Sequence, residues 1–376
     1  MRIPALAAAA ALLLMVPAGA AVAAPATAPP PGPSTLAEGL VGPLHLSVGP
    51  GATVTVSEEF GGRLTAVTRS GATSTVYASP VDGDGNPEWD VAGSDHRGST
   101  LYFVESQGAG PEDPRPLAGA LRSIDSNGTV RTVTDQLGAY EDANNPDGGQ
   151  SYGLSAADVA ANPQCVAELG AVGFPASYTG ELDSHPYAVA VVGPVALVAD
   201  AGANAILAVS LRTGNIRTLA VLPPQPAVIT PEAATNLGIP SCANLTYAFE
   251  PVPTDVAVGP GGKVYVSLLP GGPEDASLGV RGSVWRVNPF TGNARQYVGG
   301  LLSPTGIDVA RDGTLYVASL FGEGVYSVSA RHQRVSLVLP AVQAADVEVS
   351  GSTLYATTNA FGNGSLVSLR LGGHRS

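Results

Sequence analysis

The chain has 376 residues, of which 44% are hydrophobic and only 13% are charged, so it is long enough to bury a large core. Its 47 glycines and 32 prolines argue against long helices, because both residue types disfavour helix interiors. The net charge of −13 excludes a basic phosphate-binding face, and therefore nucleic acid as the main partner.

Residues 1–23 have the pattern of a secretory signal peptide. Arg2 precedes an apolar run, and residues 21–23 form a small-x-small cleavage site. We expect the Pro-rich segment 24–35 that follows to be an extended tether outside the fold. No later stretch has the roughly 18 consecutive apolar residues of a membrane span. The sequence therefore predicts a secreted, extracellular protein with no membrane span.

From residue 36 to residue 376, a unit of roughly 40 to 50 residues recurs about six times. Each unit opens with a Pro-containing or small-residue turn and an alternating apolar strand, as in residues 253–258 and 304–309. A second strand follows, as in residues 264–266, and then a third and a fourth strand separated by a Gly-containing turn. This pattern predicts an all-β fold, a single six-bladed β-propeller, with an open β-sandwich as the alternative.

The two ends of the repeat region complement each other. The sixth unit ends after its third strand, residues 365–371, whereas residues 36–40 resemble the fourth-strand ending at residues 297–301. We expect the N-terminal strand to complete the last blade, because this pairing removes an exposed sheet edge and closes the ring.

Four insertions interrupt the repeat, and each falls at one of two positions in the unit. Two join a fourth strand to the next first strand, and two join a second strand to a third. In a propeller, both kinds of connection emerge at the same end of the strands, so we expect all four at one mouth of the central channel. The insertions are residues 106–120, 138–184, 223–251 and 269–282.

Two of the insertions show helix signals. Asn162-Pro163 and Thr230-Pro231 each place an N-cap residue before a proline at the first helical position. Gly170 and Gly238 are the expected helix ends.

The two cysteines, Cys165 and Cys242, lie one in each of these insertions. Two cysteines in an exported protein usually pair, and neither has a second Cys or a His at the spacing of a metal site. We therefore expect a structural disulfide between insertions of adjacent blades.

Four segments resemble the ScyD/ScyE family of secreted bacterial proteins, and the resemblance covers nearly the whole mature chain. The segments are residues 140–149 (YEDANNPDGG), 183–189 (DSHPYAV), 200–204 (DAGAN) and 252–262 (VPTDVAVGPGG). The family is similar to the NHL-repeat and gluconolactonase-like propellers. The resemblance implies a propeller fold and does not point to a particular reaction.

The candidate site residues are polar side chains expected near the channel mouth. Asp255 and Asp346 begin inner strands and His185 precedes another, so the three are a candidate site for a divalent cation such as Ca²⁺. Solvated or turn-capping aspartates are the alternative interpretation. Further binding candidates from the resembling segments are Glu141, Asn145, Asp183, Asp200 and Asn204.

The leading functional interpretation is an extracellular binding or scaffold module. We expect a monomer that binds a small molecule, a glycan or a protein on the insertion-rich face. The alternative is a metal-dependent lactonase or related hydrolase with Glu141 beside the cation set, because gluconolactonase-like propellers use an ion to polarise a lactone and a carboxylate to move the proton. A quinone-dependent dehydrogenase is disfavoured, since cationic residues for an anionic cofactor are scarce. The catalytic residues stay unassigned.

Overall fold

The computed structural model describes residues 32–109, 115–273 and 276–372. The predicted signal peptide and residues 24–31 of the predicted tether lie outside the described residues. So do residues 110–114 and 274–275, which belong to two of the predicted insertions. Within the described ranges, no helix is long and apolar enough to cross a membrane.

Six four-stranded antiparallel sheets follow one another along the chain, and we number them blades 1 to 6. Blade 1 consists of β2 (Pro43–Val48), β3 (Val54–Glu58), β4 (Arg63–Val67) and β5 (Thr73–Ala78). Blade 2 consists of β6 (Asp90–Arg97), β7 (Thr100–Gln107), β8 (Ala118–Ile124) and β9 (Val130–Thr134). Blade 3 consists of β12 (Pro186–Val192), β13 (Val195–Asp200), β14 (Ala205–Ser210) and β15 (Ile216–Val221).

The second half of the chain repeats this arrangement. Blade 4 consists of β18 (Pro253–Gly259), β19 (Lys263–Leu268), β20 (Gly282–Val287) and β21 (Ala294–Leu301). Blade 5 consists of β22 (Pro304–Val309), β23 (Leu315–Ser319), β24 (Gly324–Val328) and β25 (Val335–Pro340). Blade 6 consists of β26 (Val347–Ser350), β27 (Thr353–Thr358), β28 (Gly364–Arg370) and β1 (Ser34–Leu40).

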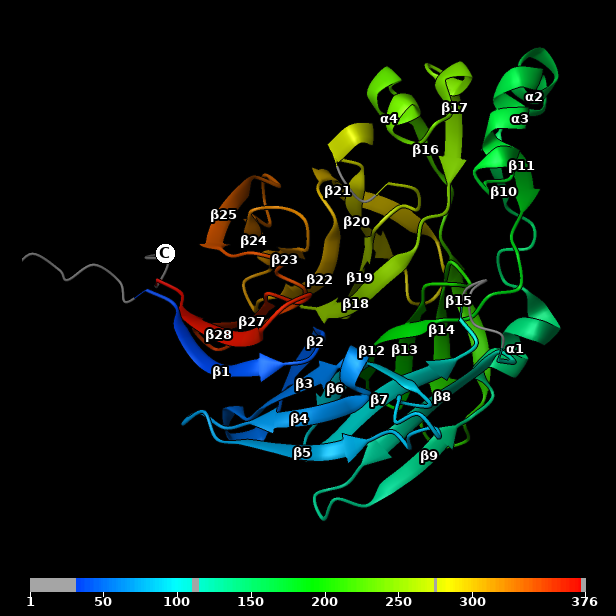
Figure 1. Cartoon of the computed structure of the whole chain (residues 1–376). Coiled ribbons are helices and arrows are strands. Elements are labelled where there is room, and N and C mark those ends of the chain that lie inside the picture. The colour runs from blue at the N-terminus through cyan, green and yellow to red at the C-terminus, as the bar shows by residue number, and fades with distance from the viewer. Residues whose placement is uncertain (1–31, 110–114, 274–275, 373–376) are drawn as a thin grey trace, which may run out of the picture. The chain divides into compact units, whose positions relative to one another are not determined.

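The blades close into a ring around their first strands. Neighbouring first strands contact each other in the order β2, β6, β12, β18, β22, β26, and β26 also contacts β2. In blade 6, β1 pairs antiparallel with β28, with Ala37 opposite Leu366, as the blue and red ends of the ribbon show (Figure 1). The prediction of an all-β six-bladed propeller closed by the N-terminal strand is confirmed. Because β1 begins at Ser34, it includes the last two residues of the predicted tether.

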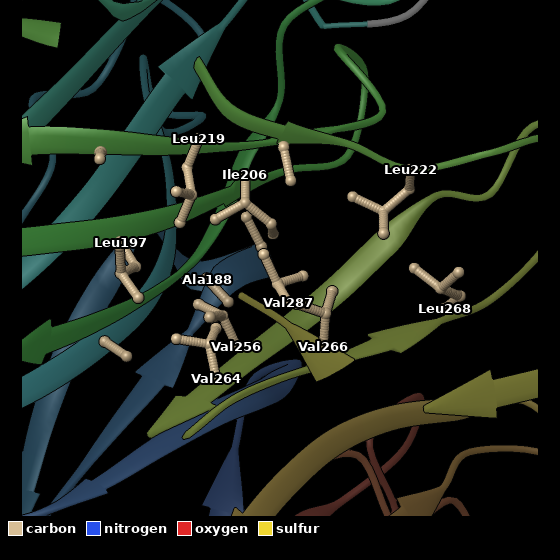
Figure 2. Close-up of a cluster of buried hydrophobic side chains, with 14 residues drawn as sticks. Ala188, Leu197, Ile206, Leu219, Leu222, Val256, Val264, Val266, Leu268 and Val287 are labelled. Atoms are coloured by element: carbon tan, nitrogen blue, oxygen red, sulfur yellow. The ribbon is translucent and has the colours of Figure 1, made fainter. Parts of the chain in front are cut away.

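The hydrophobic core lies in layers between neighbouring blades, because period-2 alternation turns apolar side chains of each sheet toward the next one. Figure 2 shows the layer between blades 3 and 4, where Leu197 and Ile206 cluster with Val256 and Val264. Burying one such side chain stabilises the fold by about 1.5–3 kcal/mol.

The two longest insertions together form a seventh four-stranded sheet, which no pattern in the sequence predicted. Its order is β11-β10-β17-β16, so the central pair joins strands of different insertions. Figure 1 shows this sheet and helices α2, α3 and α4 standing away from the blades. The first insertion contains α1 (Leu137–Asn144), β10 (Ser151–Leu154), α2 (Ala156–Ala161), α3 (Pro163–Ala171) and β11 (Ser177–Thr179). The second contains β16 (Gln225–Val228), α4 (Pro231–Asn236), the 3₁₀ turn η3 (Pro240–Cys242) and β17 (Thr246–Phe249).

The predicted disulfide is confirmed. Cys165 of α3 and Cys242 of η3 are bonded, with their Cα atoms 4.8 Å apart, and both are buried beside Tyr247. The bond therefore fastens one insertion to the other.

Both helices begin at the predicted prolines, but the Asn162 side chain makes no capping hydrogen bond, and one predicted helix end is wrong. In α4, Thr230 Oγ1 accepts a hydrogen bond from Ala233 N, and Gly238 follows with φ +74°. The other helix, α3, continues past Gly170 to Ala171, and the left-handed residue after it is Gly173. The predicted insertion 106–120 is also shorter than expected, because β7 runs to Gln107 and β8 starts at Ala118.

Candidate functional site

The insertions emerge at one end of the blades. Successive strands of a blade are antiparallel, so the turn between its second and third strands lies at the same end as the link to the next blade. We call this end the mouth face. Thr230 of the second long insertion donates a hydrogen bond to Ser277 O of the blade 4 insertion at 2.7 Å, which joins two of these segments.

A polar cavity of about 210 Å³ lies among the first strands of all six blades. No lysine or arginine is among the described residues that line it. Five carboxylates line it instead, and we call them the channel carboxylates: Asp95, Asp255, Asp308, Asp346 and Glu348.

The channel carboxylates link neighbouring blades. Asp255 Oδ2 accepts a hydrogen bond from Ile307 N of the next blade at 2.7 Å, and its Oδ1 accepts from Val256 N. A first strand is the inner edge of its sheet, so its outward backbone N–H groups have no ladder partner. The carboxylates supply those partners. The remaining links are Asp95 to Val191 N, Asp308 to Val349 N, Asp346 to Leu46 N and Glu348 to Val48 N.

Burial raises the pKa of every channel carboxylate. Burial and the nearby carboxylates raise the pKa of Asp255 to about 7 and that of Asp346 well above its usual range. Burial also raises the pKa of Asp95 and Asp308 to about 6, although backbone N–H donors oppose the shift. The cavity therefore favours protons or other positive charge.

The predicted cation set does not form. In the part of the chain that the structure describes, no three His, Cys, Asp or Glu side chains form a group that could hold a metal ion. Both carboxylate oxygens of Asp255 and of Asp346 accept backbone hydrogen bonds, and His185 is not grouped with them. Carboxylate oxygens suit a hard cation, but those of Asp255 and Asp346 already accept hydrogen bonds from backbone N–H groups.

A group of five side chains lies where the channel meets the mouth face, and we call it the mouth cluster: His45, Glu59, Asp90, His185 and Tyr187. The ring of Tyr187 lies 4.6 Å from the ring of His45 and 5.3 Å from that of His185, both edge to face. The Nε2 atoms of both histidines are buried, and neither has a hydrogen-bond partner among the described residues.

The environment of the mouth cluster sets its protonation. Burial, and then His185, lower the pKa of His45 to about 3, and burial also lowers the pKa of His185. Both imidazoles are therefore neutral at pH 7. Burial and the neighbouring Asp90 raise the pKa of Glu59 to about 8, so this carboxyl is mostly protonated at pH 7. Of the mouth cluster, only His185 was predicted as a site residue, since His45, Glu59, Asp90 and Tyr187 come together only when the closed propeller brings blades 1, 2 and 3 side by side.

Most of the remaining candidates gather at the base of the long insertions in an acidic cluster. Asn204 Nδ2 donates to Asp147 Oδ2 at 2.9 Å, and Tyr152 donates to the same oxygen at 2.8 Å. Burial, and next Asp200 and Asp147, raise the pKa of Glu141 to about 8. Its two oxygens are buried without a hydrogen bond of good geometry among the described residues.

The other candidates contact this acidic cluster. Asp200 accepts hydrogen bonds from Ser184 Oγ and from His185 N, which ties the cluster to the mouth. Asn145 donates to Gly180 O at 3.0 Å, and Asp183 is one of the charges beside Glu141. The structure therefore brings Glu141, Asn145, Asp183, His185, Asp200 and Asn204 together, whereas Asp255 and Asp346 belong to the channel.

No family model and no curated protein sequence matches this chain. Solved structures do match it. A gluconolactonase from Xanthomonas campestris is 14% identical over 90% of this chain and 89% of its own, with a TM-score of 0.54. A protein of unknown function from Bacteroides thetaiotaomicron is 12% identical over 90% of this chain and 75% of its own, with a TM-score of 0.56. The PQQ-bound aldose sugar dehydrogenase from Streptomyces coelicolor is 14% identical over 91% of this chain and 99% of its own, with a TM-score of 0.50. These similarities show the propeller fold alone.

Proposed function

We propose that this chain is a secreted, monomeric propeller of the ScyD/ScyE type that binds a small hydroxylated molecule, such as a sugar, at the mouth cluster. The unpartnered Nε2 atoms of His45 and His185 carry this proposal. Buried polar atoms are nearly always hydrogen-bonded, so two such atoms at the entrance of a polar cavity fit a ligand group. A neutral imidazole nitrogen donates or accepts according to its tautomer, and a hydroxyl group can serve either.

A thermal-shift screen with sugars and sugar lactones tests the proposal, because a ligand that binds only the folded state raises its melting temperature. We expect a saturable rise for at least one compound. The same rise is expected in His332→Ala, a control at an exposed histidine, and is lost in His185→Ala. No shift for any compound, or an equal shift in His185→Ala, contradicts the proposal.

A lactone or ester hydrolase of the gluconolactonase-like class is the second candidate, favoured by the Glu59 and Asp90 pair. Glu59 as the protonated acid can donate a proton to the leaving oxygen, while Asp90 as a carboxylate accepts one from the attacking water. Glu59→Gln and Asp90→Asn should each abolish lactone hydrolysis measured by proton release. Activity that persists in both variants removes this candidate.

The cofactors of related propellers fit this cavity poorly. A directly bound divalent ion lacks a ligand group among the described residues, and an anionic quinone such as PQQ lacks a cationic partner in the cavity lining. A melting temperature measured before EDTA, after EDTA and after calcium is restored tests the ion directly. A reversible fall of several degrees would show that an ion is bound.

A further inference from the structure

Three phenylalanines on the mouth face form a row, which we call the aromatic shelf: Phe60, Phe361 and Phe321. The rings of Phe60 and Phe361 are 6.0 Å apart with planes at 13°, and those of Phe361 and Phe321 are 5.9 Å apart with planes at 20°. Nearly parallel rings at this spacing are stacked with an offset, so they form one continuous stepped row of aromatic rings.

The shelf repeats with the blades. Each phenylalanine lies in the turn between the second and third strands, in blades 1, 6 and 5, and each is followed by glycine. All three side chains are open to solvent, with 53%, 50% and 38% of Phe60, Phe361 and Phe321 exposed. Three exposed rings at one repeat position contribute little to the core, and contiguous exposed apolar surface usually marks an interaction site.

The base of the shelf is rigid. Leu320 and Ala360, which precede Phe321 and Phe361, are buried in one cluster with Leu44 and Ala345. Phe60 packs so closely on Gly42 that a Cβ atom there would lie 2.3 Å from its ring. The rings are therefore held in place before any ligand binds.

The shelf continues from the mouth cluster. Phe60 follows Glu59 directly, and Leu44 precedes His45. The shelf and the mouth cluster therefore share the chain segments 44–45 and 59–60.

The charge around the shelf selects the ligand. An open depression of about 600 Å³ borders Phe321 and contains the exposed Glu323 beside the apolar side chain of Val342. Arg63, in the blade that carries Phe60, already pairs with Glu58 through two hydrogen bonds. The exposed charge beside Phe321 is therefore negative, and aromatic faces also attract cations.

We propose that the aromatic shelf is a binding subsite for a planar aromatic molecule with a positive charge, whose ring system lies on the phenylalanines and whose cation faces Glu323. This inference rests on the proposed function, since it assigns the apolar and charged part of a ligand to the same mouth face. The phenylalanine rings themselves offer no hydrogen bonds to a sugar, so the shelf is distinct from the hydroxyl-binding histidines.

Fluorescence titration with proflavine, a planar aromatic cation, tests this subsite, with pyrenesulfonate as the anionic aromatic control. We expect saturable binding of proflavine and much weaker binding of pyrenesulfonate. Phe361→Ala should weaken proflavine binding by about tenfold, and Glu323→Gln by about threefold. Phe290→Ala is the matched control, because Phe290 is 92% exposed in a turn at the opposite end of the blades, and it should bind as wild type does.

The outcomes separate the two proposals. Equal affinities for proflavine and pyrenesulfonate, or a Phe361→Ala variant that binds normally, overturn the subsite. If a sugar raises the melting temperature but proflavine does not bind, the shelf proposal is wrong and the mouth cluster is still supported as the ligand site. Because Phe361 is half exposed, an unchanged melting temperature of Phe361→Ala should accompany the loss of binding.

Discussion

The carboxylate Oδ2 of Asp346 accepts a 2.7 Å hydrogen bond from the backbone N–H of Leu46, which lies 300 residues earlier in the chain. Glu348, two residues after Asp346, accepts a second such bond from Val48 N across the same blade boundary. These contacts join the last blade to the first at the channel, while β1 and β28 join the chain ends within blade 6. Ring closure therefore depends on a buried polar link as well as on strand pairing.

We predict that Asp346→Ala destabilises the ring. The substitution leaves Leu46 N and Val347 N buried without acceptors, and each orphaned group costs about 1–3 kcal/mol. Urea denaturation should show a loss of about 2–4 kcal/mol in the free energy of unfolding. Asp84→Ala, at an exposed turn aspartate, is the control and should change stability little. An equal effect of the two substitutions would falsify the assigned role.

Gly93→Ala should weaken the boundary between blades 2 and 3. A Cβ atom on Gly93 would lie 2.6 Å from the Cα atom of Ala188, which is backbone and cannot move aside without displacing β12. We expect a loss of about 1–3 kcal/mol in the free energy of unfolding. Gly83→Ala is the matched control, because no atom lies within 4 Å of a Cβ atom there. If Gly93→Ala were as stable as Gly83→Ala, the boundary between blades 2 and 3 could accommodate a methyl group without loss of stability, and the prediction would be wrong.

Removing the disulfide with Cys165→Ser and Cys242→Ser should loosen the insertions before the blades. The bond closes a loop with a sequence separation of 77, and its loss costs about 4.5 kcal/mol on the chain-entropy account. Hydrogen exchange should accelerate in residues 151–179 and 225–249, while the β13 and β19 amides stay protected. If hydrogen exchange instead accelerated equally over the whole chain, the insertions would unfold together with the six blades as one cooperative unit.

The buried carboxyl groups should make the protein more stable as the pH falls from about 8.5 to about 6. Burial raises the folded-state pKa of Glu59 and Glu141 to about 8 and that of Asp255 to about 7, whereas unfolded carboxyl groups titrate at about 4. The folded state therefore binds these protons more tightly. The stability that results is full below about pH 4 and is lost as the pH rises through 7 to 8.

Below about pH 6.5, the buried histidines should oppose this trend without reversing it. Burial lowers the pKa of His45 to about 3 and also lowers that of His185, so acid protonates these groups in the unfolded chain first. The carboxyl groups with a raised pKa outnumber these two histidines, so calorimetry should find a higher melting temperature at pH 6 than at pH 8.5. A melting temperature that climbs steadily toward pH 8.5 would contradict the carboxyl assignment.

Several features of the fold were predictable because their signals are local. The period-2 strands and the turns between them recur in every unit, and blade 6 lacks a fourth strand that residues 36–40 resemble. The disulfide was predictable because the chain has only two cysteines. The seventh sheet was not, because its central strands β10 and β17 come from different insertions and their pairing leaves no local pattern.

Only part of the candidate site could be predicted from the sequence. The Phe-Gly pairs of the aromatic shelf are visible in the sequence, but the ring closure that aligns blades 5, 6 and 1 is what places them in one row. The carboxylate of Asp255 could bind a cation, yet it accepts a hydrogen bond from the backbone N–H of Ile307, 52 residues later.

The sequence by itself determined the strands, the number of blades and the cysteine pairing, since periodicity and residue count are properties of the linear chain. The tertiary structure alone decided which carboxylates bind backbone, which histidines are left without partners and which rings meet. Those outcomes depend on burial and on neighbours contributed by other blades.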